Sequence, residues 1–239
     1  MLGKKTIAFI GAGSMAEAMI SGIVHSKKMS PKNIMVTNRS NKHRLKELQK
    51  NYGITGVSRD NLDLTNVDIL VLAMKPKDAE TTLKSLSDFL KPNHLILSVL
   101  AGISTSFIEK NLPFGQQVIR VMPNTSSMIG ESATAISPGT HTSVQNISLA
   151  EELLQCIGEV YEIPEDQMDL FTGIAGSGPA YFYYLMEHME NEAQRGGLNS
   201  QIIRKIIAQT VVGAAKMIQQ QGTSPEALRE NVTSPNGTT

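Results

Sequence analysis

Three small residues near the N-terminus have the spacing of a dinucleotide-binding loop. Gly11, Gly13 and Ala16 lie in "IAFIGAGSMAEAMISGI", residues 7–23, and match G-x-G-x-x-G/A between an apolar run and a helical pattern. The first glycine permits a tight turn, the second lets the backbone approach a pyrophosphate, and Ala16 lets the helix lie close to the sheet. A glycine turn chosen only for packing has the same letters, but the surrounding βαβ pattern favours a dinucleotide cradle.

The residues after the second apolar run indicate which dinucleotide is bound. Asn38 and Arg39 stand where NAD-preferring sites usually place Asp or Glu for the ribose hydroxyls. A carboxylate would repel a 2′-phosphate, whereas Arg39 can pair with one and Ser40 can donate to it. The sequence therefore predicts NADP(H) as the preferred cofactor, with NAD(H) as the alternative. The alternative interpretation of Arg39 is an ordinary exposed charge.

The sequence offers few groups for acid–base or metal chemistry. Reduction of a ketone requires a proton donor, usually Lys, His or Tyr. A protonated imine is already electrophilic and gives an amine that keeps its proton, so positioning and exclusion of water would suffice for hydride transfer to it. We expect no metal site, a buried apolar role for the single cysteine, Cys156, and surface or helix-face positions for the five histidines: His25, His43, His94, His141 and His188.

Four loops are candidates for the site. Residues 73–76, 98–104 and 121–125 each follow an apolar run, which places them at the carboxyl edge of a parallel sheet, where ligands bind. Lys75 is the charged residue among them, as a cofactor contact or as a solvated strand-end lysine. The fourth loop is "NVTSPNGTT", residues 231–239, whose N–H groups and hydroxyls can form a nest for a small carboxylate. A helix-capping turn is the alternative interpretation of this loop.

The elements that must position these loops alternate up to Pro164. Runs such as "VDILVLAM" and "HLILSVL" are typical of strands buried on both faces. Strands that alternate with amphipathic helices imply a mostly parallel sheet with right-handed crossovers. The expected strands are residues 6–10, 34–37, 68–74, 94–100, 117–122, 133–136 and 160–163, and the expected helices are 14–26, 41–52, 77–89, 104–111 and 143–157.

The periodicity after Pro164 is helical, with two long helices over 178–197 and 200–222. The second of these is apolar on more than one face, so we expect it to pack against a second subunit. The fold class is α/β: a Rossmann-type dinucleotide-binding domain, residues 1–164, followed by an all-helical dimerisation and substrate-binding domain, residues 165–239.

The charge composition of the chain argues against some classes of binding partner. The 239 residues include 22 basic and 22 acidic side chains, and this balance argues against binding to nucleic acid or to an anionic membrane. The basic cluster His43, Arg44, Lys46 and Lys50 is interrupted by leucines and indicates the solvated face of a helix. The N-terminus has no signal-peptide pattern and its apolar run is too short to span a bilayer, so we expect a soluble, cytoplasmic protein.

Motifs along the whole chain resemble those of pyrroline-5-carboxylate reductases. They are "FIGAGSMAEAMISGI", "NRS", "AMKP", "SVLAGIS", "RVMPNTSSMIGES", "GIAGSGPAYFYYLMEHM" and "VTSPNGTT", in the order found in that family. The glycine motif is generic, whereas "AGSGPAY" and the "TSPxGTT" loop are specific. The resemblance implies reduction of Δ1-pyrroline-5-carboxylate to L-proline with NADPH or NADH, the final step of proline biosynthesis. It also implies a homodimer interlocked through the helical domain, with dimers often assembling into larger rings.

The resemblance also assigns roles to particular residues. It implies that Thr239 lies close to the imine nitrogen as the proton donor or orienting group. The implied cofactor-binding residues are Gly11, Gly13, Ser14, Met15, Asn38, Arg39, Ser40, Met74, Lys75, Pro76, Ala101 and Gly102. The implied substrate-binding residues are Val232, Ser234, Asn236, Gly237, Thr238 and Thr239, reaching in from the partner subunit.

The sequence departs from the family pattern at three places. Asn236 replaces a glycine, and Ser126 replaces a common proline, which we expect to loosen that loop. The family continues beyond the position of Thr239, so we expect the helical domain here to lack its last helix.

Two other functions compete with imine reduction. A β-hydroxyacid-type dehydrogenase would place a catalytic lysine in the first long helix of the second domain, but residues 179–194 contain no lysine. A non-catalytic dinucleotide-binding protein would keep the cradle alone, and the intact "TSPNGTT" argues against it.

Overall fold

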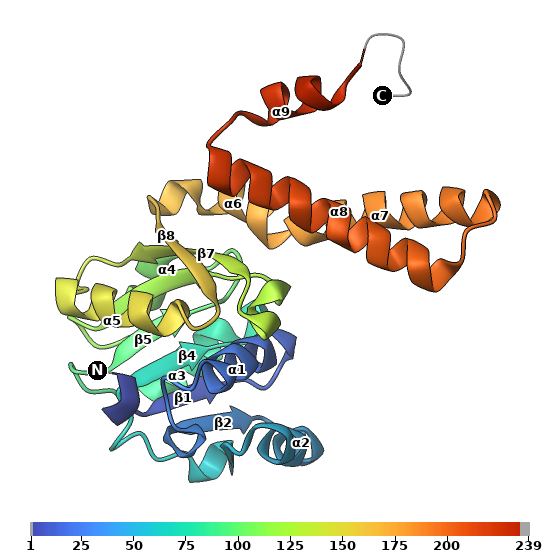
Figure 1. The fold of residues 1–239 in the computed structure, drawn as a ribbon. Helices are drawn as coiled ribbons and strands as arrows, with labels where there is room; N and C mark the ends of the chain where they lie inside the picture. The colour runs from blue at the N-terminus through green and yellow to red at the C-terminus, as the bar shows by residue number, and fades with distance from the viewer. Residues whose placement is uncertain (1, 235–239) are drawn as a thin grey trace. The chain divides into compact units, whose positions relative to one another are not determined.

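The computed structural model describes residues 2–234 (Figure 1). By its internal contacts the chain divides into two compact units, residues 1–179 and 180–239. Our predicted boundary after Pro164 marks the change in periodicity, and the segment that follows it packs with the first unit up to Pro179. The two units are described separately.

The first unit is built on a sheet of eight strands in the order β3-β2-β1-β4-β5-β6-β7-β8. All neighbouring strands pair in parallel except β6 and β7, which are antiparallel. The predicted α/β class with a mostly parallel sheet is thus confirmed. The strands are β1 (Ile7–Ile10), β2 (Ile34–Asn38), β3 (Thr55–Ser58), β4 (Ile69–Leu72), β5 (Leu95–Ser98), β6 (Gln117–Met122), β7 (Ser132–Pro138) and β8 (Gly158–Glu162).

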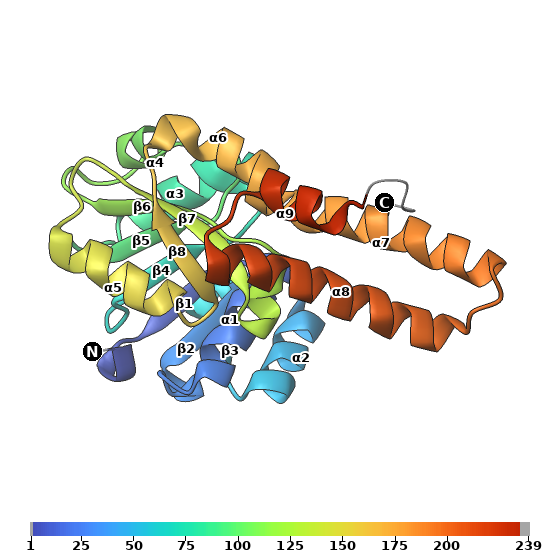
Figure 2. The same ribbon diagram turned by 45° about the horizontal axis from the view of Figure 1, so that its top comes forward.

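Helices cover both faces of this sheet because successive side chains of each strand point to opposite sides (Figure 2). Ile7 and Phe9 of β1 join the core cluster of α1, α2 and α5, while Ala8 and Ile10 join that of α3 and α4. The helices of this unit are α1 (Ser14–Ser26), α2 (Lys42–Tyr52), α3 (Ala79–Ser87), α4 (Thr105–Lys110), α5 (Val144–Leu154) and α6 (Met168–Phe171). Short helical turns used below are η3 (Arg59–Asn61), η4 (Pro76–Asp78), η5 (Thr125–Ile129) and the π-helical η7 (Thr172–Gly176).

Strand β3 was not predicted. Its sequence, Thr-Gly-Val-Ser, contains neither an apolar run nor a clear alternation, and none of its residues is fully buried. It forms because β2 offers a free edge, with which it pairs in parallel from Met35↔Thr55 to Asn38↔Ser58. The pairing therefore brings the residue after Ser58 next to the residue after Asn38.

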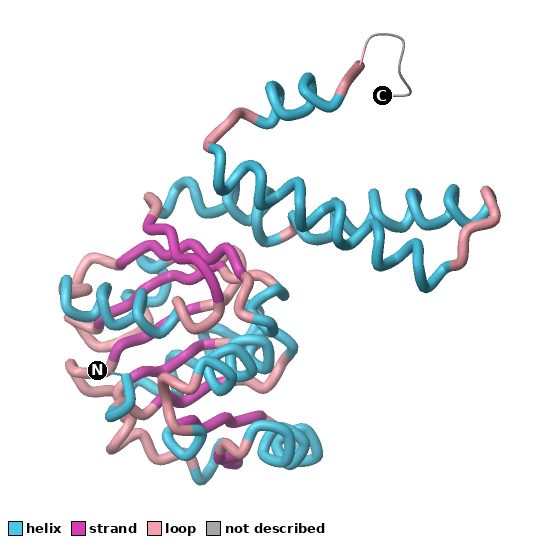
Figure 3. Tube along the Cα trace, viewed as in Figure 1, coloured by secondary structure: helices cyan, strands magenta, loops and turns pink. Residues whose placement is uncertain are grey.

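The second unit consists of helices, and no strand follows Glu162 within the part of the chain that the structure describes (Figure 3). Its elements are α7 (Gly178–Arg195), which begins in the first unit, α8 (Ser200–Gln221) and α9 (Pro225–Val232). Asn199 and Ser224 cap α8 and α9 through their side chains. Arg204 of α8 pairs with Glu190 of α7 at 2.7 Å, which ties the two long helices together.

Large apolar side chains of α7 and α8 are exposed. They are Tyr181, Phe182, Tyr183, Tyr184, Leu185 and Met189 on α7, and Ile202, Ile206, Val212, Met217 and Ile218 on α8. Large apolar side chains exposed in this number on two paired helices are typical of an interaction face. Within residues 2–234, none of the helices combines the length and the apolar character needed to cross a membrane.

Candidate functional site

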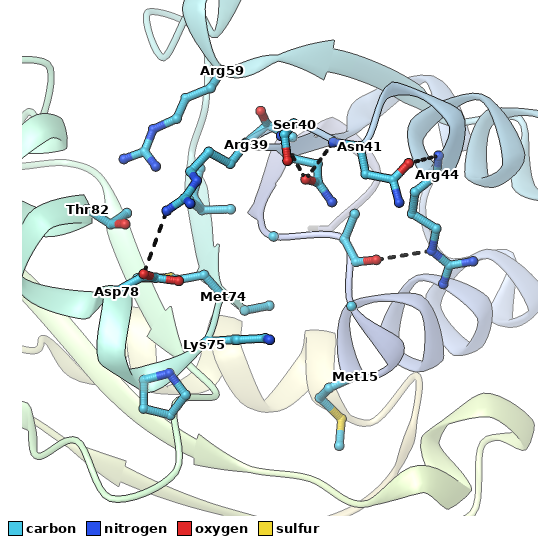
Figure 4. Close-up of a pocket in the computed structure, with 18 of the residues that line it drawn as sticks. Met15, Arg39, Ser40, Asn41, Arg44, Arg59, Met74, Lys75, Asp78 and Thr82 are labelled. Carbon is cyan, nitrogen blue, oxygen red and sulfur yellow. Dashed lines mark hydrogen bonds and ion pairs between the residues drawn. The ribbon is translucent and has the colours of Figure 1, made fainter.

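A cavity of about 1330 Å³ opens at the carboxyl ends of β1, β2 and β4 (Figure 4). Three loops line it: the glycine loop before α1, the loop after β2, and the loop between β4 and α3. Ten of the twelve cofactor-binding residues expected from the sequence lie on its wall: Gly11, Gly13, Ser14, Met15, Asn38, Arg39, Ser40, Met74, Lys75 and Pro76. Ala101 and Gly102 do not line it, although they follow β5, the neighbour of β4.

The two glycines of the loop have different physical reasons to be glycine. Gly11 has a φ of +123°, and a Cβ there would collide with the backbone of Ala73 and lie 2.8 Å from the nitrogen of Met74. A Cβ on Gly13, by contrast, would meet no heavy atom within 4 Å. Gly11 therefore serves the packing of the loop on β4, whereas Gly13 keeps open a surface that a bound molecule can approach.

The N-terminus of α1 lies at this open surface. Gly13 is the N-cap residue, in extended conformation, and no side chain caps the first turn. Ser14 and Met15, the first two helical residues, line the cavity. Free N–H groups and the positive end of the helix dipole together form an anion site.

A carboxylate in the first turn of α1 is neutralised by neighbouring groups. Glu17 pairs through Oε2 with Arg44 Nη2 and accepts through Oε1 a hydrogen bond from the Tyr52 hydroxyl at 3.1 Å. The hydrogen bond with Glu17 raises the pKa of Arg44, and burial together with the same carboxylate raises that of Tyr52. The negative charge of Glu17 is thus offset before an anion approaches the helix.

Arg44 also holds the glycine loop itself. Its Nε donates to the carbonyl oxygen of Ala12 at 3.1 Å, and its Nη1 pairs with Glu47 at 2.9 Å. Its side chain is 20% exposed. The predicted solvated face of α2 is therefore wrong at this residue, because the guanidinium turns inward to carboxylate and carbonyl acceptors.

The cavity wall is cationic. Five basic side chains line it, against two acidic ones, Glu17 and Asp78; the basic ones are Arg39, Arg44, Arg59, Lys75 and Lys77. Asp78 lies 3.8 Å from the exposed guanidinium of Arg39. The buried Thr37 Oγ1, also on the wall, has no hydrogen-bond partner among the described residues. A molecule with several phosphates and free hydroxyls fits this set of groups.

Sequence reasoning missed several polar residues of this wall, among them Arg44, Arg59 and Thr37. Arg44 was masked by its basic neighbours, Arg59 follows the strand that was not predicted, and Thr37 looked like an ordinary strand residue. For Arg44 a signal exists in the sequence. An arginine three residues after a capping Asn lies near the start of its helix, at the same sheet edge as the glycine loop.

The loop after β6 is fixed by Asn124. Its Nδ2 donates to the carbonyl oxygen of Ala175 in the π-helical η7 at 3.0 Å. Its Oδ1 accepts from the N–H of Ser126 at 2.9 Å, a bond that proline at this position would not make. The replacement of proline by Ser126 therefore adds a hydrogen bond, which opposes the loosening that we expected there.

The structure describes only part of the expected substrate loop. Val232 is the last residue of α9 and is exposed, and Ser234 follows it. Asn236, Gly237, Thr238 and Thr239 lie outside the described residues.

Two expectations outside the cavity have different outcomes. Cys156 is buried, as predicted. His94 is not on a surface: it is fully buried, its Nδ1 accepts from the N–H of Lys91 at 3.0 Å, and its Nε2 faces the carbonyl oxygen of Leu64 at 3.2 Å. Burial lowers the pKa of His94, and the bond that its Nδ1 accepts from Lys91 closes the turn before β5.

Comparison with known proteins identifies the family. Residues 165–239 match the family model described as pyrroline-5-carboxylate reductase dimerisation, and residues 6–102 match that of NADP oxidoreductase, coenzyme F420-dependent. The chain is 61% identical to pyrroline-5-carboxylate reductase 1 of Bacillus spizizenii over 99% of its own length and 80% of the relative's. The chain belongs to the pyrroline-5-carboxylate reductase family.

Solved structures agree with this membership. A pyrroline-5-carboxylate reductase from Coxiella burnetii has a TM-score of 0.86 and 33% identity, covering 98% of this chain and 87% of that one. The enzyme from Plasmodium falciparum, described with NADP bound, has a TM-score of 0.90 at 24% identity, covering 99% and 87%, which shows a shared fold. The family places this chain among the pyridine-nucleotide oxidoreductases with a dimerisation domain.

Proposed function

We propose that this chain reduces the C=N bond of Δ1-pyrroline-5-carboxylate to give L-proline, the last step of proline biosynthesis. The observation that carries the proposal is its 61% identity to a pyrroline-5-carboxylate reductase over 99% of the chain. The cationic cavity beside an uncapped helix N-terminus supports the proposal, because the phosphates of a dinucleotide would fit there.

NADPH is the proposed preferred cofactor, with NADH as the alternative. Arg39 lines the cavity directly after β2, where NAD-preferring sites carry an acidic residue. Asn38, at the end of β2, uses its Oδ1 to accept from the N–H groups of Ser40 and Asn41 at 3.2 and 3.3 Å. These bonds hold the loop in which Arg39 and Ser40 line the cavity, and both residues would contact a 2′-phosphate there.

Reduction of a protonated imine requires the protein mainly to position the cofactor and the substrate. NADPH, when bound, supplies a hydride. The glycine loop, Arg39 and Ser40 would hold this dinucleotide, and the C=N bond of the protonated substrate would become the C–N bond of proline as its π electrons move to nitrogen. Because the nitrogen already carries its proton, this chain's residues need to hold the dinucleotide and the substrate carboxylate in register and keep water away.

The proposed substrate site is the loop after α9. Val232, Ser234, Asn236, Gly237, Thr238 and Thr239 would bind the carboxylate of the substrate through N–H groups and hydroxyls. Thr239 would lie at the imine nitrogen as the proton donor or orienting group. This assignment rests on the match of the loop to the family pattern.

We also propose a homodimer joined through the helical unit. The exposed apolar side chains of α7 and α8 are typical of a surface that a second chain buries, and residues 165–239 match the dimerisation model of the family. A second copy supplies a face of the same chemistry, as two-fold interfaces require. Assembly of dimers into a ring is the larger form that we propose.

A cytoplasmic place of action follows from the same proposal. Biosynthetic reductions with NADPH occur where the reduced nucleotide is regenerated. Assay of the reductase in cytosolic and membrane fractions of the source cells tests this point.

The deciding experiment follows the absorbance of reduced nicotinamide after addition of pyrroline-5-carboxylate, with NADPH and NADH in separate assays. We expect substrate-dependent oxidation that is faster with NADPH, and proline as the product. Thr239→Ala should slow turnover by about 100-fold, because the substrate nitrogen loses its orienting group, without changing the affinity for NADPH. Thr140→Ala, an exposed hydroxyl loss in the first unit outside the cavity and the proposed substrate loop, is the control. Binding of NADPH without turnover would favour the non-catalytic alternative.

A further inference from the structure

A second arginine stands beside Arg39 because of the strand that was not predicted. In the parallel pair of β2 and β3, Asn38 is in register with Ser58. Arg39 and Arg59 are the residues that follow each member of this pair, at the same edge of the sheet. Both line the cavity, and Figure 4 shows the two side chains reaching into it from the same side.

Arg59 is held in place without being neutralised. Its Nη2 donates to Ser85 Oγ at 2.7 Å, and Ser85 Oγ in turn donates to the carbonyl oxygen of Thr82 at 2.8 Å. No carboxylate among residues 2–234 forms an ion pair with Arg59. The one carboxylate on this side of the wall, Asp78, lies 3.8 Å from Arg39 instead. One hydroxyl therefore orients Arg59 and leaves its charge available.

We infer that Arg59 and Arg39 together form the site for the 2′-phosphate of NADPH, and that Arg59 is a specificity-determining residue for this cofactor. The inference rests on the proposed function and extends it to a residue that follows a different strand, β3. Two guanidiniums present several N–H donors to a dianionic phosphate, and charge-assisted hydrogen bonds of this kind are stronger than neutral ones. A cofactor that lacks the 2′-phosphate gains nothing from them.

The test uses ligands that differ only in this phosphate. Binding of 2′,5′-ADP and of 5′-AMP to the full chain is measured by calorimetry, for the parent protein and for Arg59→Gln. We expect the variant to bind 2′,5′-ADP about tenfold more weakly or worse, and 5′-AMP within about twofold of the parent. Lys50→Gln removes an exposed charge from α2 outside the cavity and should change neither affinity.

Other outcomes overturn the inference. Equal weakening of both ligands would place Arg59 at the adenine or adenosine, and no weakening of either would show that it contacts neither. Arg59→Lys, which keeps the charge but loses the planar fork, should fall between the parent and Arg59→Gln, and circular dichroism confirms that both variants fold. Because these measurements need no turnover, tight binding of 2′,5′-ADP without reduction of pyrroline-5-carboxylate would refute the proposed reaction and leave the role of Arg59 intact.

Discussion

The Nε of Arg44 on α2 donates a hydrogen bond to the carbonyl oxygen of Ala12, 3.1 Å away in the glycine loop. The same guanidinium pairs with Glu17 on α1, so one side chain links the second helix to both sides of the dinucleotide cradle. The cradle is therefore shaped by a residue thirty-two positions further along the chain.

Replacement of Arg44 by Lys should loosen the cradle. A lysine keeps the positive charge but cannot reach Ala12 and Glu17 with one planar group. We expect the KM for NADPH to rise about tenfold with little change in kcat. Glu47→Gln, which removes the other partner of Arg44, should leave KM within about twofold. Equal effects of the two variants would argue against a specific role for the bond to Ala12.

Substitution of the two glycines of the loop should have different effects: Gly11→Ala should lower the stability of the fold, and Gly13→Ala should weaken the binding of NADPH. Gly11→Ala places a methyl group against the backbone of Ala73 at a φ of +123°, and should lower the free energy of unfolding by about 2 kcal/mol or more. Gly13→Ala has room for its methyl group and an ordinary φ of −76°, so unfolding should change by less than about 0.5 kcal/mol. Its affinity for NADPH should still fall about tenfold or more, since the methyl group enters the surface that the pyrophosphate approaches. Urea denaturation and cofactor titration measure the two effects; normal binding by Gly13→Ala would rule out this placement of the pyrophosphate.

Two carboxylates near Arg120 should contribute very differently to stability. Glu165 accepts from the N–H and the hydroxyl of Thr105 at 2.8 and 2.7 Å and lies 3.5 Å from Arg120, whose side chain is 7% exposed. Asp169 also pairs with Arg120, at 3.2 Å, but is 88% exposed. Glu165→Gln should destabilise the fold by about 1–3 kcal/mol, because the buried guanidinium keeps only the exposed Asp169 as a counter-charge and Thr105 loses one of its two carboxylate acceptors. Asp169→Asn should cost under about 1 kcal/mol. Thermal unfolding of both variants at neutral pH makes the comparison, and the reverse order would contradict it.

His94 should make stability depend on pH in the mildly acidic range. Burial lowers its pKa in the folded state, so the unfolded chain binds the proton more readily. The contribution of neutral His94 is therefore fully present above the unfolded pKa of about 6.5 and is lost as the pH falls below it, by at most about 1.4 kcal/mol per pH unit. Urea denaturation at mildly alkaline and mildly acidic pH should show a smaller loss for His94→Asn, whose amide oxygen can still accept from the N–H of Lys91. An identical pH dependence in the variant and the parent would exclude His94 as the cause.

A charge on the exposed face of α8 should weaken the proposed dimer. Ile206 is 54% exposed on the helix whose apolar residues we assign to the interface. Ile206→Glu should raise the dimer dissociation constant by about 100-fold or more, because a desolvated carboxylate has no partner there. Asn51→Glu, an exposed residue at the end of α2, is the matched control. Light scattering over a dilution series follows both, and a monomeric parent protein would refute the assignment.

The sequence by itself determined the class of the fold and the position of the glycine loop between its first strand and first helix. Buried parallel strands such as β4 and β5 are nearly continuous apolar runs, and Gly11, Gly13 and Ala16 are local requirements of a turn between a strand and a helix, so both can be read without knowing what lies nearby. Ten of the twelve residues expected at the cofactor lie on one cavity because they belong to loops that follow parallel strands, and the carboxyl ends of parallel strands meet at one edge of the sheet.

Only the tertiary structure decided which other side chains join them. Strand β3 has no apolar signature and exists because β2 has an edge to offer, so the placement of Arg59 beside Arg39 is a property of the pairing and not of the local sequence. In the sequence, Arg44 cannot be distinguished from its solvated neighbours, and only the fold places it against the carbonyl of Ala12 and the carboxylate of Glu17. In the same way, the sequence predicts an exposed His94, whereas the fold buries it against Lys91 and Leu64. Long-range partners set the burial and charge of such polar residues, and a pattern read along one stretch of chain contains no information about them.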